Sequence, residues 1–137
     1  MKIPKLEEML KRAWCEQTTK NWSPENPALG HCAVTALVVQ DYLGGDIVRT
    51  EAVLPDEKKD PHYYNIIDGQ EIDLTKQQFP ERTIIPKGIE KLQGIKEGKP
   101  IGPFRSTREY ILAFPETAKR YDILKLRVWK EYGCSIF

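Results

Sequence analysis

The fold is organised around residues 30–45, which read GHCAVTALVVQDYLGG. Apolar residues lie almost all the way round a helix drawn from Cys32 to Leu43, so this segment predicts a helix buried in the middle of the molecule. The Gly44-Gly45 pair that follows is typical of a helix end, because glycine adopts the left-handed backbone conformation readily. Cys32 is therefore expected at or just before the first turn of a buried helix.

Residues 62–74, which read HYYNIIDGQEIDL, give the clearest local signal. The Asp-Gly pair at 68–69 separates two strand-like runs and predicts a hairpin with a type I′ turn. In that register Tyr64 lies opposite Asp73, and His62 shares a sheet face with Asp73 as its diagonal neighbour. An aspartate that accepts from one imidazole nitrogen leaves the other nitrogen free to take a proton from a thiol.

The remaining segments complete an α+β fold. Apolar spacing predicts an amphipathic helix over residues 3–17, and Pro115 opens a final helix that extends to about Tyr132. Residues 46–54 are rich in β-branched side chains and predict a strand. We expect the buried central helix to pack on a small antiparallel sheet, flanked by the N- and C-terminal helices. A length of 137 residues without a linker predicts a single domain, residues 1–137.

The stretch before the last helix is expected to be irregular. Residues 81–104 contain three prolines and four glycines and predict mostly loop, with a short helix over residues 89–92. A second short helix is expected over residues 108–114, where Ser106 or Thr107 caps its start. Residues 74–80 predict a short turn or helix.

The composition excludes several classes of function. The formal charge is only +1, from 21 basic and 20 acidic residues, which argues against a nucleic-acid partner. The N-terminus is charged where a signal peptide would be apolar, and no segment is apolar enough to span a membrane. We therefore expect a cytoplasmic protein with no membrane partner. Its three cysteines suggest free thiols rather than a disulfide framework.

Cys32 is the candidate nucleophile. The amide groups and dipole at a helix start stabilise a thiolate, and the same amides can donate to an oxyanion beside the sulfur. His62 would then act as the base, and Asp73 would orient its imidazole. Each residue also has a structural interpretation: Cys32 as a small buried apolar residue, His62 as a strand-end histidine, and Asp73 as a turn-capping carboxylate.

Three other residues are candidates for contact with a substrate or an oxyanion: His31, Trp22 and Tyr64. His31 precedes the thiol and could donate a hydrogen bond to an oxyanion, and Trp22 could wall a substrate groove or anchor the packing. His31, Cys32, His62 and Asp73 are also zinc-ligand types, but no paired ligand motif supports a zinc site. We expect no metal and no cofactor.

These motifs resemble the YunG-like family of small, mainly bacterial proteins that are largely uncharacterised. The resemblance is carried by the Cys32 helix, His62-Tyr63-Tyr64-Asn65, and Asp73-Leu74-Thr75 with Gln78-Phe79. It covers roughly residues 22–79 closely and the C-terminal helix more loosely. The chain order Cys, His, Asp also resembles papain-like and transglutaminase-like enzymes, and implies their type of core. In papain-like enzymes a glutamine upstream of the nucleophile often supplies the oxyanion donor. In this sequence the residue just before the thiol is His31, whose imidazole could donate instead.

The sequence therefore predicts a thiol-dependent acyl-transfer enzyme, either a cysteine peptidase, an amidase or a transglutaminase-like enzyme. Its substrate would be peptide-like or an amide. Two alternatives remain open: a non-catalytic module that binds a ligand or protein in the same cleft, and a structural partner protein that docks through its terminal helices.

Overall fold

The computed structural model describes the backbone of residues 1–136 and the side chains of residues 1–133. Within that range, four α-helices and one short 3-10 helix accompany a three-stranded antiparallel sheet of order β1-β2-β3. The elements are α1 (Ile3–Ala13), α2 (Cys32–Leu43), β1 (Asp46–Val53), β2 (Lys59–Ile67), β3 (Gln70–Ile72), η1 (Lys76–Gln78), α3 (Thr107–Leu112) and α4 (Pro115–Ile136). The expected α+β class is confirmed at this level.

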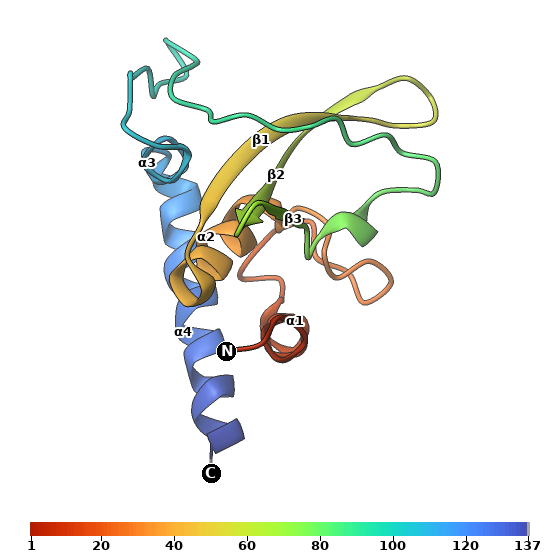
Figure 1. The fold of residues 1–137 in the computed structure, drawn as a ribbon, viewed down its shortest axis with the longest axis vertical. Helices are drawn as coiled ribbons and strands as arrows, with labels where there is room; N and C mark the ends of the chain where they lie inside the picture. The colour runs from red at the N-terminus through yellow and green to blue at the C-terminus, as the bar shows by residue number, and fades with distance from the viewer. Residues whose placement is uncertain (137) are drawn as a thin grey trace.

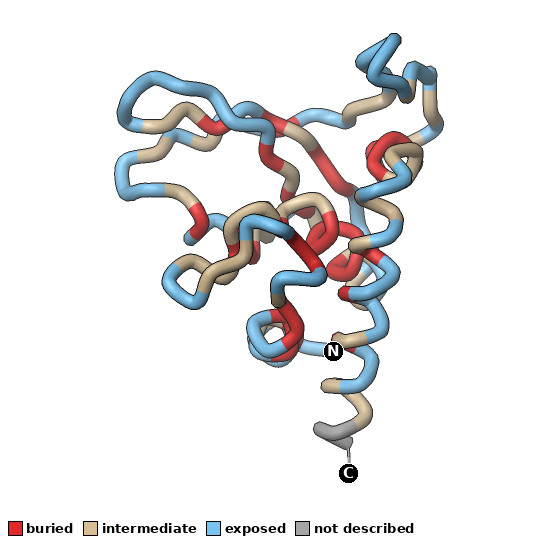
Figure 2. Tube along the Cα trace, turned by 180° about the vertical axis from the view of Figure 1, so that it is seen from behind, coloured by how far each residue is buried: buried red, intermediate tan, exposed pale blue. Residues whose placement is uncertain are grey.

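The central helix α2 organises the core. Figure 1 shows α2 in the middle of the molecule, with α4 running along one side and α1 near the lower end. Six consecutive residues of α2, from Val34 to Val39, are buried, and α2 packs against β2 and α4. The buried residues in Figure 2 gather where the strands, α2 and α4 meet, whereas the upper loops are mostly exposed. A helix this rich in apolar residues is stable only when neighbours cover those residues, as they cover Val34 to Val39 here.

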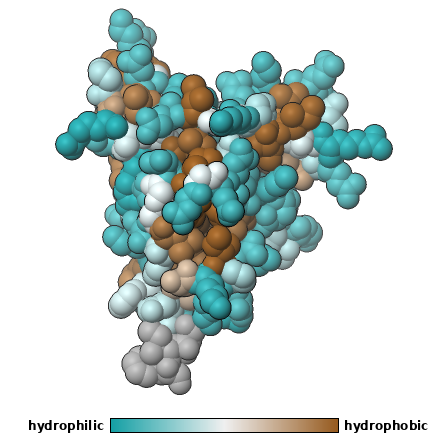
Figure 3. All heavy atoms as spheres, viewed as in Figure 1, coloured by the Kyte–Doolittle hydropathy of each residue, from teal (hydrophilic) through white to brown (hydrophobic). Residues whose placement is uncertain are grey.

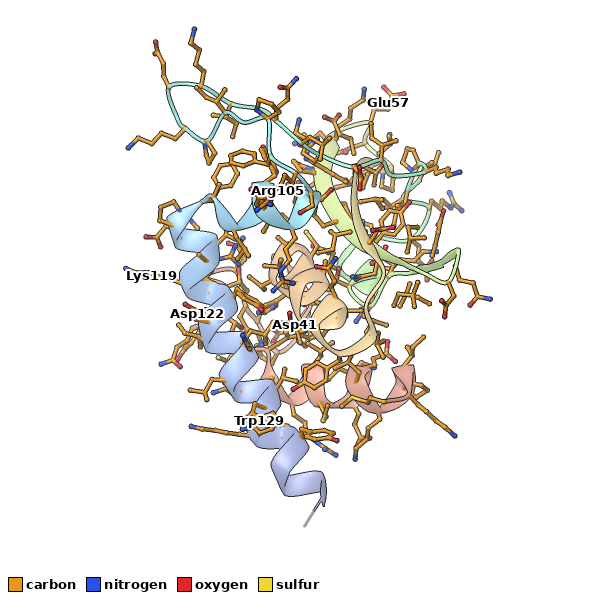
Figure 4. The ribbon with its side chains drawn as sticks, turned by 60° about the vertical axis from the view of Figure 1, so that its left-hand side comes forward. Asp41, Glu57, Arg105, Lys119, Asp122 and Trp129 are labelled. Atoms are coloured by element: carbon orange, nitrogen blue, oxygen red, sulfur yellow. The ribbon has the colours of Figure 1, made fainter. Side chains whose placement is uncertain are left out.

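Polar contacts connect α2 to the rest of the fold near its C-terminal end and at its middle. Near its C-terminal end, Asp41 accepts from Arg108 at 2.9 Å and from the Tyr121 hydroxyl at 2.5 Å. Midway along it, the Asn65 amide of β2 donates to the Ala36 carbonyl at 3.0 Å. Figure 4 labels Asp41 on α2. These contacts join α2 to α3, α4 and the sheet, and they fix its position along its own axis.

The hairpin turn has the expected conformation and register. Asp68 and Gly69 both have positive φ, 51° and 78°, as a type I′ turn requires. Ile67 pairs with Gln70, and Asn65 pairs with Ile72. Asp73 therefore follows the strand end opposite Tyr64, which confirms the predicted register.

The segment before α3 differs from the prediction. Residues 89–92 are not helical; instead Ile84 and Ile89 each make an isolated antiparallel bridge to β1, with Val53 and Arg49 respectively. Each bridge has two backbone hydrogen bonds of 2.8–3.0 Å. Prolines and glycines prevent a helix here, and the free edge of β1 offers backbone partners instead. The segment thus covers an edge strand, along the top of the molecule in Figure 1.

The ends of several helices and strands also differ from those expected from the sequence. The first helix ends at Ala13 rather than residue 17, because residues 15–19 form a turn in which Thr18 and Thr19 donate to the Cys15 carbonyl. β2 begins at Lys59, before His62, and the last helix extends to Ile136. The Ser106 hydroxyl accepts from the Glu109 amide at 3.2 Å, so Ser106 is the cap of α3.

The surface is mixed in character. On the face drawn in Figure 3, apolar side chains gather along the middle and at the upper right, and polar side chains surround them. None of the described helices combines the length and the apolar character needed to cross a bilayer.

Gly45, between α2 and β1, should tolerate no side chain. Its φ is +78°, and a Cβ would lie 2.3 Å from the Ile66 carbonyl oxygen. We expect Gly45→Ala to lower the free energy of unfolding by about 2 kcal/mol or more, because left-handed backbone and a backbone clash add together. Gly133→Ala in α4 is the control, since a Cβ there meets nothing within 4 Å. Equal effects of the two variants in chemical denaturation would contradict this account.

Candidate functional site

The imidazole of His62 is fixed by Asp73. His62 Nε2 lies 2.7 Å from Asp73 Oδ2, and the side chain of His62 is fully buried whereas that of Asp73 is 14% exposed. The other oxygen of Asp73 accepts from the Thr75 amide at 3.3 Å, which closes a small turn after β3. One oxygen of Asp73 is thus held by the backbone amide of Thr75, and the other oxygen orients the ring of His62.

The second nitrogen of this ring faces the thiol. His62 Nδ1 is buried and makes no hydrogen bond of regular geometry; within the described side chains it is the one buried nitrogen or oxygen atom in this state. Cys32 lies close enough to act on the pKa of His62 both by hydrogen bonding and by its charge. Since Nε2 is bound to Asp73, Nδ1 is the atom available to Cys32.

The environment of His62 favours its charged form. Burial alone lowers the pKa, but hydrogen bonding to Asp73 and to Cys32, together with their charges, outweighs burial and raises the pKa of His62 to about 9. An imidazole with this pKa carries its proton at neutral pH. The arrangement therefore places a charged imidazole between the sulfur of Cys32 and the carboxylate of Asp73.

Cys32 is the first residue of α2. The residue before it, His31, provides no side-chain cap, and the first turn contains no acidic side chain. The amide groups of that turn are therefore free of any competing carboxylate, and they can donate to a developing negative charge. Cys32 is partly exposed and unpaired, as a reactive thiol must be.

Two residues that follow Asp73 support this arrangement and were not assigned a role from the sequence. Gln78 is buried; its side-chain oxygen accepts from the Gly30 amide at 3.3 Å and its amide donates to the Thr75 carbonyl at 3.0 Å. Gln78 thus connects the loop before Cys32 to the turn after Asp73. The ring of Phe79 packs edge-on against His62, with centroids 4.9 Å apart. The only sequence signal was their place in the family motif.

His31 does not belong to the site, contrary to expectation. It is fully buried, and its ring stacks on Trp14 with centroids 5.4 Å apart. Its Nδ1 donates to the Pro27 carbonyl at 2.8 Å, and its Nε2 lies 2.5 Å from the Thr18 hydroxyl. Because both nitrogens are engaged, His31 has no free N–H for an oxyanion.

Burial is the main reason why the pKa of His31 falls to about 4. The charge of Arg120 lowers it further, and the bond to Pro27 opposes both effects only in part. A neutral imidazole that donates through Nδ1 to the Pro27 carbonyl still has the Thr18 hydroxyl within hydrogen-bond reach of Nε2, so both ring nitrogens have partners. His31 is a structural residue that holds the loop in front of α2.

The other two candidates are mainly packing residues. Tyr64 is 2% exposed, stacks near His62, and its hydroxyl accepts from the Gly88 amide at 2.6 Å. The ring of Tyr64 thus packs on the ring of His62, and its hydroxyl binds the segment that runs along β1. Trp22 is half-buried and packs against the core.

The zinc alternative is not supported. Among the described residues no group of three or more His, Cys, Asp or Glu side chains is placed to hold a metal ion, and both nitrogens of His31 have other partners. Cys32, His62 and Asp73 interact with one another instead.

The fold and the site together define an α+β protein that presents a thiol at the start of a buried helix, next to an imidazole bound by a carboxylate. The chain belongs to the YunG protein family, whose model matches residues 2–133. It is 42% identical over 71 residues to the uncharacterized protein YunG of Bacillus subtilis (strain 168). That alignment covers 52% of this chain and 57% of the relative, so the chain matches less than two thirds of the relative's length. No solved structure matches significantly.

The two histidines should titrate far apart. Nuclear magnetic resonance of the ring signals should show His62 losing its proton near pH 9 and His31 gaining one only near pH 4, with neither near the ordinary 6.5. Cys32→Ala and Asp73→Asn should each lower the pKa of His62, because each removes an interaction that favours the imidazolium. His31→Asn assigns the signals, since the chain has two histidines. Two titrations near pH 6.5 would contradict the site as described.

Proposed function

We propose that this protein is a thiol-dependent acyl-transfer enzyme with Cys32 as nucleophile, His62 as proton carrier and Asp73 as the residue that orients His62. The observation that carries this proposal is the buried Nδ1 of His62, which lacks a regular partner beside a helix-start thiol while Asp73 holds Nε2. Unpaired buried polar atoms are rare in folded proteins, and they concentrate at functional sites.

The chemistry follows from the positions of these groups. The Cys32 thiolate attacks the carbonyl carbon of an amide, and a sulfur–carbon bond forms while the carbonyl oxygen becomes negative. The free amides of the first turn of α2 donate to this oxygen. The carbon–nitrogen bond then breaks, and His62 gives its Nδ1 proton to the departing amine. Water, or a second amine, attacks the thioester and returns a proton to His62, which gives hydrolysis or transamidation respectively.

A papain- or transglutaminase-like core is part of the same proposal. It is supported by a cysteine at the start of a central helix, a histidine on β2 and an aspartate directly after β3. The substrate class that fits this chemistry is a peptide-like or other amide. Free thiols suit a reducing compartment, so we assign the activity to the cytoplasm.

Selective alkylation of Cys32 tests the proposal. In a brief iodoacetamide pulse at pH 6.5, Cys32 should react about tenfold faster than Cys15, because an ordinary thiol is almost wholly protonated there. His62→Ala should remove most of this advantage, since it removes the imidazolium. Asp73→Asn should reduce the advantage less, because His62 remains next to the sulfur. Mass spectrometry of digested protein reads the extent of labelling at each cysteine.

Asp68→Asn is the matched control for Asp73→Asn. It makes the same chemical change in the same hairpin, at an exposed turn residue, and it should leave the labelling of Cys32 unchanged. If Cys32 reacts no faster than Cys15 and is indifferent to His62→Ala, the acyl-transfer proposal fails. The non-catalytic binding module would then be the better account.

A further inference from the structure

A cavity of about 310 Å³ is lined by residues of α2, β1, β2, α3 and α4. Its lining includes Ala33, the residue after Cys32, and Tyr63, the residue after His62. Ala33 follows Cys32 in the first turn of α2, so the start of that helix borders the cavity. The charge of Cys32 also acts on the pKa of Tyr63 and of Arg120, two residues of the lining, which agrees with this placement. A volume of this size is at the lower end of ligand sites and fits about one or two amino-acid residues.

The lining combines aromatic surface with two positive charges. Tyr63, Tyr110 and Phe114 provide rings, Arg49 and Arg120 provide guanidinium groups, and the lining contains no acidic side chain. A larger cavity of about 470 Å³, which Arg120 also lines, differs because its lining includes Glu16 and Glu116 together with Lys20. The smaller cavity is therefore the positively charged one.

Neither arginine of this cavity has an acidic partner. Among the described residues no carboxylate lies within 4.0 Å of the guanidinium of Arg49 or of Arg120. The half-buried Arg108, by contrast, pairs with Asp41 at 2.9 Å. Burial is the main effect on the pKa of Arg120 and lowers it, and the charges of Cys32 and Glu116 oppose burial only in part.

Arg120 is also held in place. Its Nη1 donates to the carbonyl oxygens of Thr18 at 3.1 Å and of Gly30 at 3.3 Å, which fixes the group beside the loop in front of Cys32. Its other nitrogens donate to no atom of the described residues, so they are available to a bound anion. Arg49 reaches the same cavity from β1, where it pairs with Tyr63 of β2.

We propose that this cavity binds the part of the substrate next to the scissile amide, and that this part is a carboxylate on an apolar or aromatic body. This inference rests on the proposed function, because it assigns a substrate class to the same site. Two planar guanidinium groups match a carboxylate in geometry, and aromatic walls suit an apolar side chain. A small N-acyl amino acid or the carboxyl end of a peptide has this chemistry.

The test compares two reagents that differ only in charge. Iodoacetate and iodoacetamide both form a sulfur–methylene bond at Cys32 and release iodide, but only iodoacetate carries a carboxylate. The measured quantity is the ratio of the two rates at Cys32, with free N-acetylcysteinamide as the reference thiol. We expect the ratio in the wild-type protein to exceed the reference, and Arg49→Gln and Arg120→Gln each to lower it about fivefold.

Lys119→Gln is the matched control, since it removes the same charge one residue away on the exposed side of α4 (Figure 4). It should leave the ratio unchanged, which separates the two arginines from net charge and from the imidazolium of His62. Arg120→Lys keeps the charge and should retain most of the preference. If Arg120→Gln proves unstable, the inference is tested by Arg49→Gln, which should lower the ratio, and by Arg120→Lys, which should keep most of it.

Two results would overturn the inference, and they are distinguishable. If both arginine variants keep the wild-type ratio while Cys32 still reacts with iodoacetamide in a His62-dependent way, the proposed function stands and the assigned substrate class is wrong. If Cys32 reacts no faster than the reference thiol with either reagent, both proposals fail.

A second measurement tests the apolar body. N-acetylphenylalanine should slow the iodoacetamide labelling of Cys32 more than acetate, which lacks the ring, and more than N-acetylphenylalaninamide, which lacks the charge. Equal effects of the three compounds would overturn the assignment.

Discussion

The 2.7 Å contact between His62 Nε2 and Asp73 Oδ2 is the interaction on which the site depends. A charged imidazole inside a protein is stable only beside an anion, and Asp73 supplies that anion. The contact also fixes the ring, because it leaves Nδ1 a single orientation, toward the thiol. Asp73 is placed by the register of the β2–β3 hairpin, which the two-residue turn at 68–69 determines. A local turn thus sets the position of the atom that would transfer a proton.

The two histidines show how burial has opposite consequences when the partner differs. Both His31 and His62 are fully buried, and burial disfavours the charge of each. His31 meets a carbonyl and a hydroxyl, which satisfy a neutral ring, and its pKa falls to about 4. His62 meets a carboxylate and a thiol, which favour a proton, and its pKa rises to about 9. Residue type and burial together do not decide the role of a histidine; the charge of its neighbours does.

What could be predicted from the sequence was local. The turn at 68–69 determined a register, and the apolar run after Cys32 indicated a buried helix, so both followed from period and turn chemistry. The helix expected at Ile89 was wrong because the free edge of β1 supplied backbone partners that no local pattern reveals. His31 was misassigned because its partners Thr18 and Pro27 lie in the irregular connection between α1 and α2, whose folding no periodic pattern reveals. Arg120 was missed since it meets the Cys32 loop only through tertiary packing.

His62 Nδ1 is buried and makes no hydrogen bond of regular geometry, and this has a cost that bears on whether the site is functional. A buried polar atom without a partner costs about 1–3 kcal/mol, whereas an apolar side chain of similar volume would avoid that cost. Elsewhere the described core satisfies its polar side chains, as Asn65 does on α2. The one buried side-chain nitrogen or oxygen without a regular hydrogen bond among the described residues is His62 Nδ1, beside Cys32. A site that only bound a ligand would need no thiol there, since alanine would fill the space. A thiol at a helix start next to an imidazolium is the arrangement that makes sulfur a nucleophile, which favours catalysis over binding alone.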